Sequence, residues 1–174
     1  MGISPGVDHE LKTVSEIPPH GGQLVDRVAS PTERTEIRRS VPTRLHVQLS
    51  SREYADLILL GCGAYSPLTG YQSSEDYDAV LESMRLANGL LWPLPISLSV
   101  SEEQARTLTI GDDVSLVAQG SKEIVGTLRV EDVFSYDKKR EARRVYGTED
   151  PDHPGVAALY RQQPFYIGGQ VTVF

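Results

Sequence analysis

IGDDVSLVAQGSKEIVGTLRVEDVFSYD, residues 110–137, contains two strand patterns separated by a turn. Residues 111–112 suit a turn, and apolar residues alternate along the strand that follows it: Val114, Leu116 and Ala118. A hairpin around Gly120 leads into a longer strand through Ile124, Thr127 and Val130. A meander of short strands of this kind is typical of small β-barrels.

Two segments on the N-terminal side of this meander also have strand patterns. Residues 43–50, TRLHVQLS, alternate apolar and polar side chains through Leu45, Val47 and Leu49, which predicts a strand with one buried face. Residues 91–100, LWPLPISLSV, are apolar but contain two prolines. Because proline cannot donate to a strand ladder, we expect an edge strand or a strongly bent one.

The C-terminal segment, FYIGGQVTVF (residues 165–174), predicts a strand interrupted at Gly168–Gly169. Its end, QVTVF, is apolar and lacks a polar cap. We therefore expect that a second domain covers this surface.

Two helices have clear start signals. Ser50 and Glu53 have capping-box spacing before a helix that ends near Gly61, and an apolar face is expected at Tyr54, Leu57, Ile58 and Gly61. Ser73 opens a second helix that is expected to stop at residues 88–89, Asn-Gly. Its apolar stripe comprises Tyr77, Val80, Leu81 and Met84.

Three weaker helical patterns follow. Ser101 and Gln104 repeat the capping-box spacing, and helical propensity returns at residues 138–147 and 156–162. Short strands with proline-bent edges, closed by helices at both ends, favour a small mixed β-barrel with flanking helices over a doubly wound sheet. The predicted fold class is α+β, with a loose lead-in over residues 1–16 and one folded domain over residues 17–174.

Composition narrows the class of protein. The 174 residues are 39% hydrophobic and 24% charged, close to the average for a soluble globular domain. No apolar run approaches the roughly 18 residues of a membrane span, and the N-terminus lacks the apolar stretch of a signal peptide. The single cysteine, Cys62, excludes an intrachain disulfide and is expected to pack inertly. These features predict a cytoplasmic protein.

Net charge opposes a nucleic-acid partner. The formal charge is -7, whereas phosphate binding requires clustered Lys and Arg. The one basic cluster, KKREARR at residues 138–144, is expected to be a solvated helix face.

Residues 19–22, PHGG, are the nearest approach to a phosphate-binding loop. They are followed by neither Lys-Ser nor Lys-Thr, so a turn into an extended segment is the favoured interpretation. His20 could act as a general acid or base, or its ring could bond a neighbouring carbonyl and fix the turn; the second role is favoured because no catalytic partner is evident. Residues 64–71, AYSPLTGY, predict a structured loop in which Gly70 adopts a positive φ. Trp92 is expected in the core.

Residues 147–156, GTEDPDHPGV, could bind a metal or form a stiff turn. The metal set would be Glu149, Asp150, Asp152 and His153. The structural interpretation is favoured: Pro151 and Pro154 make neighbouring side chains diverge, the two aspartates bond local N–H groups, and HPGV opens the next helix.

Five motifs, taken in order, resemble the N-terminal domain of the ATP sulfurylase (sulfate adenylyltransferase) family. They are PHGGQLVDR at 19–27, GAYSPLTGY at 63–71, MRLANGLLWPLPISLSV at 84–100, GTEDPDHPGV at 147–156 and YIGGQV at 166–171. The resemblance implies a PUA-like barrel within an enzyme that joins sulfate to ATP, with magnesium accompanying the nucleotide. It also implies signature positions with structural or interdomain roles: His20, Gly21, Gly22, Arg27, Ser66, Pro67, Gly70, Asp152, His153, Gly155, Gly168 and Gly169.

The family's nucleotide and sulfate motifs lie in a following α/β domain: Gln-x-Arg-Asn-Pro, His-x-x-His and Gly-Arg-Asp-His-Ala-Gly. None of them occurs in this chain. We therefore expect no catalytic, cofactor-binding or metal-binding residue here. The expected role is to support a C-terminal catalytic domain that binds ATP and magnesium, with a homo-oligomer possible. The alternative from another class is a stand-alone RNA- or protein-binding module that uses residues 138–144.

Overall fold

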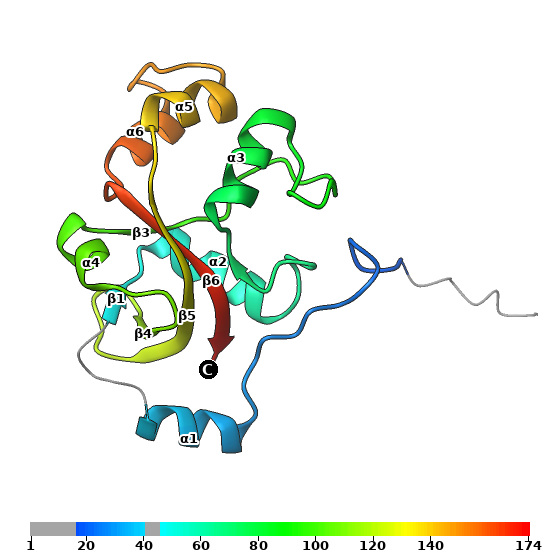
Figure 1. Ribbon diagram of the computed structural model, residues 1–174, viewed down its shortest axis with the longest axis vertical. Helices are drawn as coiled ribbons and strands as arrows, with labels where there is room; N and C mark the ends of the chain where they lie inside the picture. Colours follow the sequence, from blue (N-terminus) through cyan, green and yellow to red (C-terminus); the bar gives the residue numbers. More distant parts are fainter. Residues whose placement is uncertain (1–16, 41–45) are drawn as a thin grey trace, which may run out of the picture.

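Two long antiparallel strands cross the molecule, and shorter elements are arranged around them (Figure 1). The computed structural model describes residues 17–40 and 46–174. The helices and strands, in chain order, are α1 (Pro31–Ser40), β1 (His46–Gln48), α2 (Ser51–Gly61), β2 (Gly70–Tyr71), α3 (Ser74–Ser83), β3 (Leu98–Val100), α4 (Glu102–Thr107), β4 (Asp113–Val117), β5 (Ile124–Ser135), α5 (Lys138–Tyr146), α6 (Pro154–Tyr160) and β6 (Phe165–Val173).

The strands form one mixed sheet in the order β1-β4-β5-β6-β2, and β3 also pairs with β6. β5 and β6 pair from Gly126↔Val173 to Ser135↔Phe165, with a register shift between Val130 and Asp132. β1 runs parallel to β4, whereas the other pairs are antiparallel. The pairing path has two ends, and among the described residues no ladder joins β1 to β2 or β3. The mixed α/β architecture agrees with the predicted class, but a closed barrel is not shown.

A buried carboxylate, that of Glu53, connects the N-terminus of α2 to β3. One oxygen of Glu53 accepts hydrogen bonds from the N–H (2.8 Å) and the hydroxyl (2.6 Å) of Ser50, the N-cap residue of α2. The other oxygen accepts from the N–H and hydroxyl of Ser99 in β3, both at 2.8 Å. The capping-box glutamate of α2 thus satisfies backbone groups of two segments that do not pair with each other.

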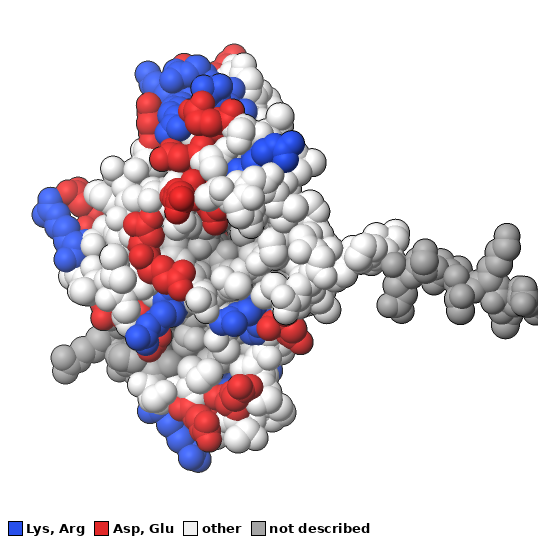
Figure 2. Space-filling view, turned by 45° about the vertical axis from the view of Figure 1, so that its right-hand side comes forward, with Lys and Arg blue, Asp and Glu red and all other residues white. Residues whose placement is uncertain are grey.

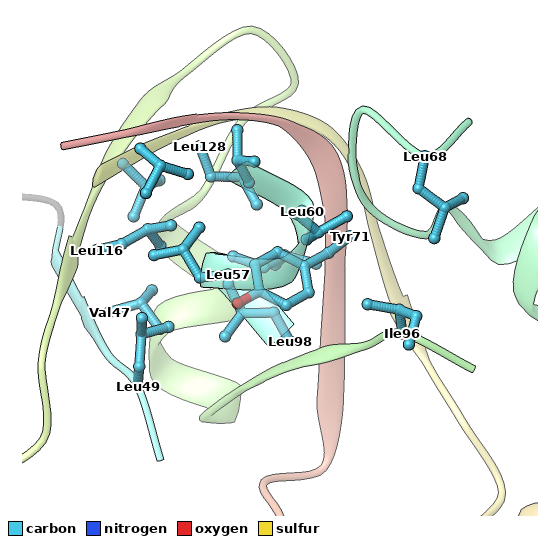
Figure 3. Packing of buried hydrophobic residues seen from close by; sticks show 14 of the residues in the cluster. Val47, Leu49, Leu57, Leu60, Leu68, Tyr71, Ile96, Leu98, Leu116 and Leu128 are labelled. Carbon is cyan, nitrogen blue, oxygen red and sulfur yellow. The ribbon is translucent and has the colours of Figure 1, made fainter. Parts of the chain in front are cut away.

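The main core lies between the sheet and α2 (Figure 3). Leu57 and Leu60 of α2 are fully buried, and side chains from each of the strands β1 to β6 belong to the same cluster. These strand residues include Val47, Tyr71, Leu98, Leu116 and Leu128. Trp92 also belongs to this core, as predicted, and is 8% exposed.

A smaller aromatic cluster joins α3 and α5 to the sheet. The rings of Tyr136 and Tyr166 stack with centroids 3.6 Å apart, and Tyr77 lies edge-on to Tyr166. Glu141 of α5 is buried at the centre, where its carboxylate accepts hydrogen bonds from the hydroxyls of Tyr77 (2.9 Å) and Tyr166 (3.1 Å). Burial raises the pKa of Glu141 above the usual glutamate value, although both hydrogen bonds oppose the shift.

Predictions that depend on neighbouring residues alone, such as turns and helix caps, are confirmed. The β4–β5 hairpin forms with the predicted turn, and Ser50 and Ser101 cap α2 and α4 with complete capping boxes. Val47 and Leu49 are buried, as the strand pattern at residues 43–50 predicts. Leu45, which was predicted to be buried, and the predicted lead-in at residues 1–16 lie outside the described residues.

Several predictions about helix faces and ends are wrong. On α2, Leu57 and Gly61 are buried as predicted, but Tyr54 (36%) and Ile58 (47%) are exposed, because the helix turns Glu53 and Leu60 towards the core instead. α3 ends at Ser83 rather than at residues 88–89, since Met84 already takes a left-handed conformation (φ 54°). Cys62 is exposed rather than packed inside.

The predicted interruption of the C-terminal strand is also wrong. β6 continues through Gly168 and Gly169, and the irregularity lies in β5, its partner. Val171 and Val173, near the apolar end of β6, are buried within this chain. Val28 forms a bridge with Val173, and the N–H of Phe174 donates to the carbonyl of Val125.

Candidate functional site

The PHGG motif forms a tight turn at one side of the molecule. The N–H of Gly22 donates to the carbonyl of Pro19 (2.8 Å), and Gly21 and Gly22 have φ values of 78° and 87°, a region that favours glycine. A Cβ atom at Gly21 would lie 3.2 Å from both Leu90 and Pro67, so the turn packs against two later motifs.

His20 binds a remote carbonyl rather than a neighbouring one. Its Nε2 lies 2.7 Å from the carbonyl oxygen of Leu91, 71 residues along the chain. Because a carbonyl only accepts, Nε2 must carry the proton and donate it. The ring centroid lies 6.1 Å from that of Trp92. The favoured role of His20, a structural bond to a carbonyl, is therefore observed, with a different partner from the one expected.

The loop at residues 63–71 supports the same region. The hydroxyl of Ser66 is buried, accepts from the N–H of Val25 (2.9 Å) and donates to the carbonyl of Gly63 (2.6 Å). The Ser66–Pro67 peptide bond is cis. Tyr65 packs edge-on against Trp92, with ring centroids 5.8 Å apart. The loop is structured, as predicted, and it holds the PHGG segment by a side chain.

A short hairpin over residues 84–92 completes this region. Its ends are joined by the bridge Arg85↔Leu91 and by the N–H of Trp92, which donates to the carbonyl of Met84 (2.8 Å). The predicted stop signal, Asn88-Gly89, is in fact the tip of this hairpin. Trp92 points into the core, whereas three apolar side chains stay more than half exposed: Met84 (58%), Leu91 (54%) and Leu94 (51%).

These segments share an unusual lack of charge. Residues 17–25, 57–74 and 86–101 contain no Asp, Glu, Lys or Arg, although 24% of the chain is charged. The structure brings parts of all three together, and Figure 2 shows the broad area without blue or red on the right of the molecule. We call residues 17–25, 63–71 and 86–94 the uncharged face. The sequence analysis did not predict this face, although the three stretches without charged residues are visible in the sequence.

Close backbone contacts connect the uncharged face to the sheet. A Cβ atom on Gly70 would lie 1.9 Å from the carbonyl oxygen of Gly169, and one on Gly168 would lie 2.5 Å from that of Gln72. Gly70 therefore serves close approach of β2 to β6, and its predicted positive φ is wrong. Arg27 donates from Nε to the carbonyl of Val171 (2.8 Å). These signature positions have packing roles.

The GTEDPDHPGV segment lies elsewhere, between α5 and α6 at the top of Figure 1. As predicted, Asp150 bonds a local N–H, that of Asp152 (2.9 Å), and HPGV opens α6, with Nδ1 of His153 accepting from the N–H of Gly155 (3.2 Å). Asp152 is exposed, and its own N–H is the donor in that turn. A Cβ on Gly155 would lie 2.5 Å from the ring of Tyr146.

The basic run on α5 is largely neutralised. Arg140 bonds Asp78 (2.6 Å) and Glu82 (2.8 Å) of α3, and Arg144 also bonds Glu82 (2.7 Å). Arg143 pairs with Glu149. The predicted solvated face is confirmed for Lys139, Arg143 and Arg144, which are exposed. Glu141 and Ala142 of the same run are buried. The three arginines bond carboxylates of α3 and of the α5–α6 turn.

A groove of about 840 Å³ lies where β1 and β3 are unpaired. Its polar lining is rich in amide and guanidinium groups: Gln48, Arg52, Gln104, Gln119, Arg161, Gln162 and Gln163. Arg52 is already engaged by Asp56 and by the carbonyl of Ser97, both at 3.3 Å. Burial raises the pKa of Asp56, which Arg52 and the Tyr65 hydroxyl partly oppose.

Several cations that could contact a triphosphate are already bonded to carboxylates. A triphosphate needs converging cationic and backbone donors, but the α5 arginines are paired with carboxylates and Arg52 is bonded to Asp56. Within residues 17–40 and 46–174, no three His, Cys, Asp or Glu side chains gather as a metal site. In the same part of the chain, no helix is long and apolar enough to cross a membrane.

Comparisons with known proteins agree with the fold. The PUA-like domain family matches residues 17–174. The chain is 46% identical over 157 residues to sulfate adenylyltransferase from Synechococcus sp. (strain JA-3-3Ab), covering 90% of this chain and 40% of the relative. It is 39% identical to the protein of the same name from Desulforamulus reducens, covering 91% and 41%. The chain thus spans about 40% of the length of these relatives.

A solved structure shows the same fold at lower sequence similarity. "Hexameric APS kinase from Thiobacillus denitrificans" superposes with a TM-score of 0.68 at 22% identity, covering 91% of this chain and 27% of that one. The chain belongs to the PUA-like domain family, and the two relatives described above are both named sulfate adenylyltransferase.

Proposed function

We propose that this chain is the N-terminal, non-catalytic domain of a sulfate adenylyltransferase, which forms adenosine 5'-phosphosulfate and pyrophosphate from ATP and sulfate. The observation that supports this most strongly is coverage: about 90% of this chain matches, but only about 40% of each relative. A polypeptide with the activity of those relatives would have a further domain. ATP, magnesium and sulfate would bind there.

The role proposed for the domain is to support the catalytic domain and, through it, a homo-oligomer in the cytoplasm. The rigid packing of the signature residues favours a scaffold over a reacting site. His20 donates to a carbonyl and has no carboxylate partner among the described residues, so it lacks the arrangement of a general base. The glycines at 70, 168 and 169 permit close backbone contacts, which is a structural function.

A titration of the chain with ATP and magnesium tests the assignment of nucleotide binding. We expect no saturable heat up to millimolar ATP in isothermal titration calorimetry, because the α5 arginines are already paired with carboxylates. An intact sulfate adenylyltransferase from Synechococcus sp. (strain JA-3-3Ab) is the positive control. Saturable binding to this chain in the micromolar range would overturn the proposal.

A second candidate function, an RNA-binding module, is favoured by the groove between β1 and β3. The side-chain oxygen of Gln119 accepts a hydrogen bond from the hydroxyl of Ser51 (2.8 Å), so its NH₂ group remains as a donor in the groove that Arg161 also lines. The basic run on α5 does not favour it, because its arginines are paired. Binding of structured RNA that Arg161→Glu weakens and Arg140→Glu leaves unchanged would support this candidate over the scaffold.

A further inference from the structure

We propose that the uncharged face is the surface on which the rest of a sulfate adenylyltransferase polypeptide docks. This inference rests on the proposed function and adds to it the place of contact. The face consists of the PHGG turn, the loop at residues 63–71 and the hairpin arm at residues 86–94, and the exposed Arg85 lies at its edge.

Composition is the first argument. A monomer of net charge -7 with 24% charged residues normally distributes charge over its surface, yet this face has none in its three segments. Leu91 and Leu94 are more than half exposed, and Leu24 is 58% exposed on the segment that follows the PHGG turn. Depletion of charge together with exposed large apolar side chains is the signature of a protein–protein contact.

Rigidity is the second argument. The face is assembled from loops, but each is fixed by a contact to another: His20 to Leu91, Ser66 to Val25 and Tyr65 to Trp92. The anchoring side chains Trp92 and Leu68 are buried in the main core. A surface that is already ordered loses little conformational entropy on binding, which favours a stable contact.

The length of the matched relatives identifies what would bind the uncharged face. The matched relatives extend over about two and a half times the matched length, since the match covers 40% of each. A covalently linked domain meets such a face at high effective concentration, so an apolar contact without charge pairs would suffice to hold it. The occupant proposed is therefore the remaining polypeptide of the same protein rather than a second copy of this chain.

The test uses this chain together with the part of the Synechococcus sp. (strain JA-3-3Ab) enzyme that lies outside its 157 matched residues. The two pieces are co-expressed, purified, and their dissociation constant is measured by calorimetry. We expect the double variant Leu91→Asp/Leu94→Asp to weaken binding by at least about tenfold, as for central apolar contacts. The matched control is Ile110→Asp, since Ile110 is apolar and 70% exposed on the turn before β4.

The outcomes separate the two proposals. Equal binding by the double variant and the unaltered chain would overturn the docking face while leaving the proposed function in place. Failure of the unaltered chain to bind would contradict the proposed function itself. If the double variant instead abolishes self-association of this chain, measured by sedimentation, a second copy is the occupant and the inference is wrong. Leu94→Asp alone replaces the double variant if circular dichroism shows that the latter is unfolded.

Discussion

At the scale of single residues, the glycines in β6 and in its partner β2 have the least space for a side chain. A Cβ at Gly70 would meet the carbonyl oxygen of Gly169 at 1.9 Å, and both atoms belong to paired strands that cannot separate without breaking the ladder. We expect Gly70→Ala to lower the free energy of unfolding by about 3 kcal/mol or more. Urea denaturation measures this loss.

Gly89 is the matched control for that substitution. It has a φ of 87°, but no atom lies within 4 Å of its Cβ position. Gly89→Ala should therefore cost only about 1–2 kcal/mol, the strain of a left-handed conformation. Equal losses at Gly70 and Gly89 would contradict the close-approach explanation.

The sequence could not distinguish these two uses of glycine. Gly70 looked like a turn residue because it follows Pro67, and its true neighbour, Gly169, lies in the last strand. Asn88-Gly89 looked like a helix stop for a similar reason: the same dipeptide also suits a hairpin tip. Local patterns predict conformation, whereas close approach depends on a partner that is remote in sequence.

The buried Glu141 predicts a pH dependence of stability. Its pKa is raised in the folded protein by burial, so the unfolded chain releases the proton at a lower pH than the folded one does. The contribution of Glu141 to stability is therefore greatest at pH values below its pKa in the unfolded chain, about 4.5. It falls as the pH rises from there through the raised pKa of the folded protein. Glu141→Gln should remove this decline.

Thermal denaturation of both proteins over a pH series measures the effect. The melting temperatures of the two proteins should differ least at pH 4. As the pH rises, the Glu141→Gln variant should become increasingly more stable than the unaltered protein. Parallel pH curves would show that the carboxylate is not titrating between these conditions.

At the scale of elements, Glu53 connects the N-terminus of α2 to β3. Glu53→Ala would leave the N–H and hydroxyl groups of both Ser50 and Ser99 without their acceptor. We expect a loss of about 3 kcal/mol, with faster hydrogen exchange at the Ser99 amide. The matched control is Gln104→Ala in the capping box of α4, which should cost only about 1 kcal/mol.

The capping boxes show which elements were predictable. Ser50–Glu53 and Ser101–Gln104 act within four residues, so their spacing alone placed the starts of α2 and α4. The second bond of Glu53, to Ser99, depends on tertiary structure and was missed. For the same reason the apolar face of α2 was misplaced, because a buried carboxylate occupies a position that hydrophobic periodicity assigns to an apolar residue.

At the scale of the whole molecule, the fold class and family were predictable and the candidate site was not. The meander at residues 110–137 indicated antiparallel strands, but closure of a barrel depends on pairing between strands that are remote in sequence, and no ladder joins β1 to β2 or β3 among the described residues. The uncharged face combines three segments that only the folded chain brings together. The motif order nevertheless pointed to the correct family.

The central claim is that this chain supports catalysis by another domain and performs none itself. Pyrophosphate release from ATP and sulfate, assayed in three samples, tests it most directly: the chain alone, the remainder of the Synechococcus sp. (strain JA-3-3Ab) enzyme alone, and both together. We expect no turnover from the chain alone and a higher rate or longer-lived activity from the pair than from the remainder. Turnover by the chain alone, or a remainder that is equally active and stable without it, would contradict the claim.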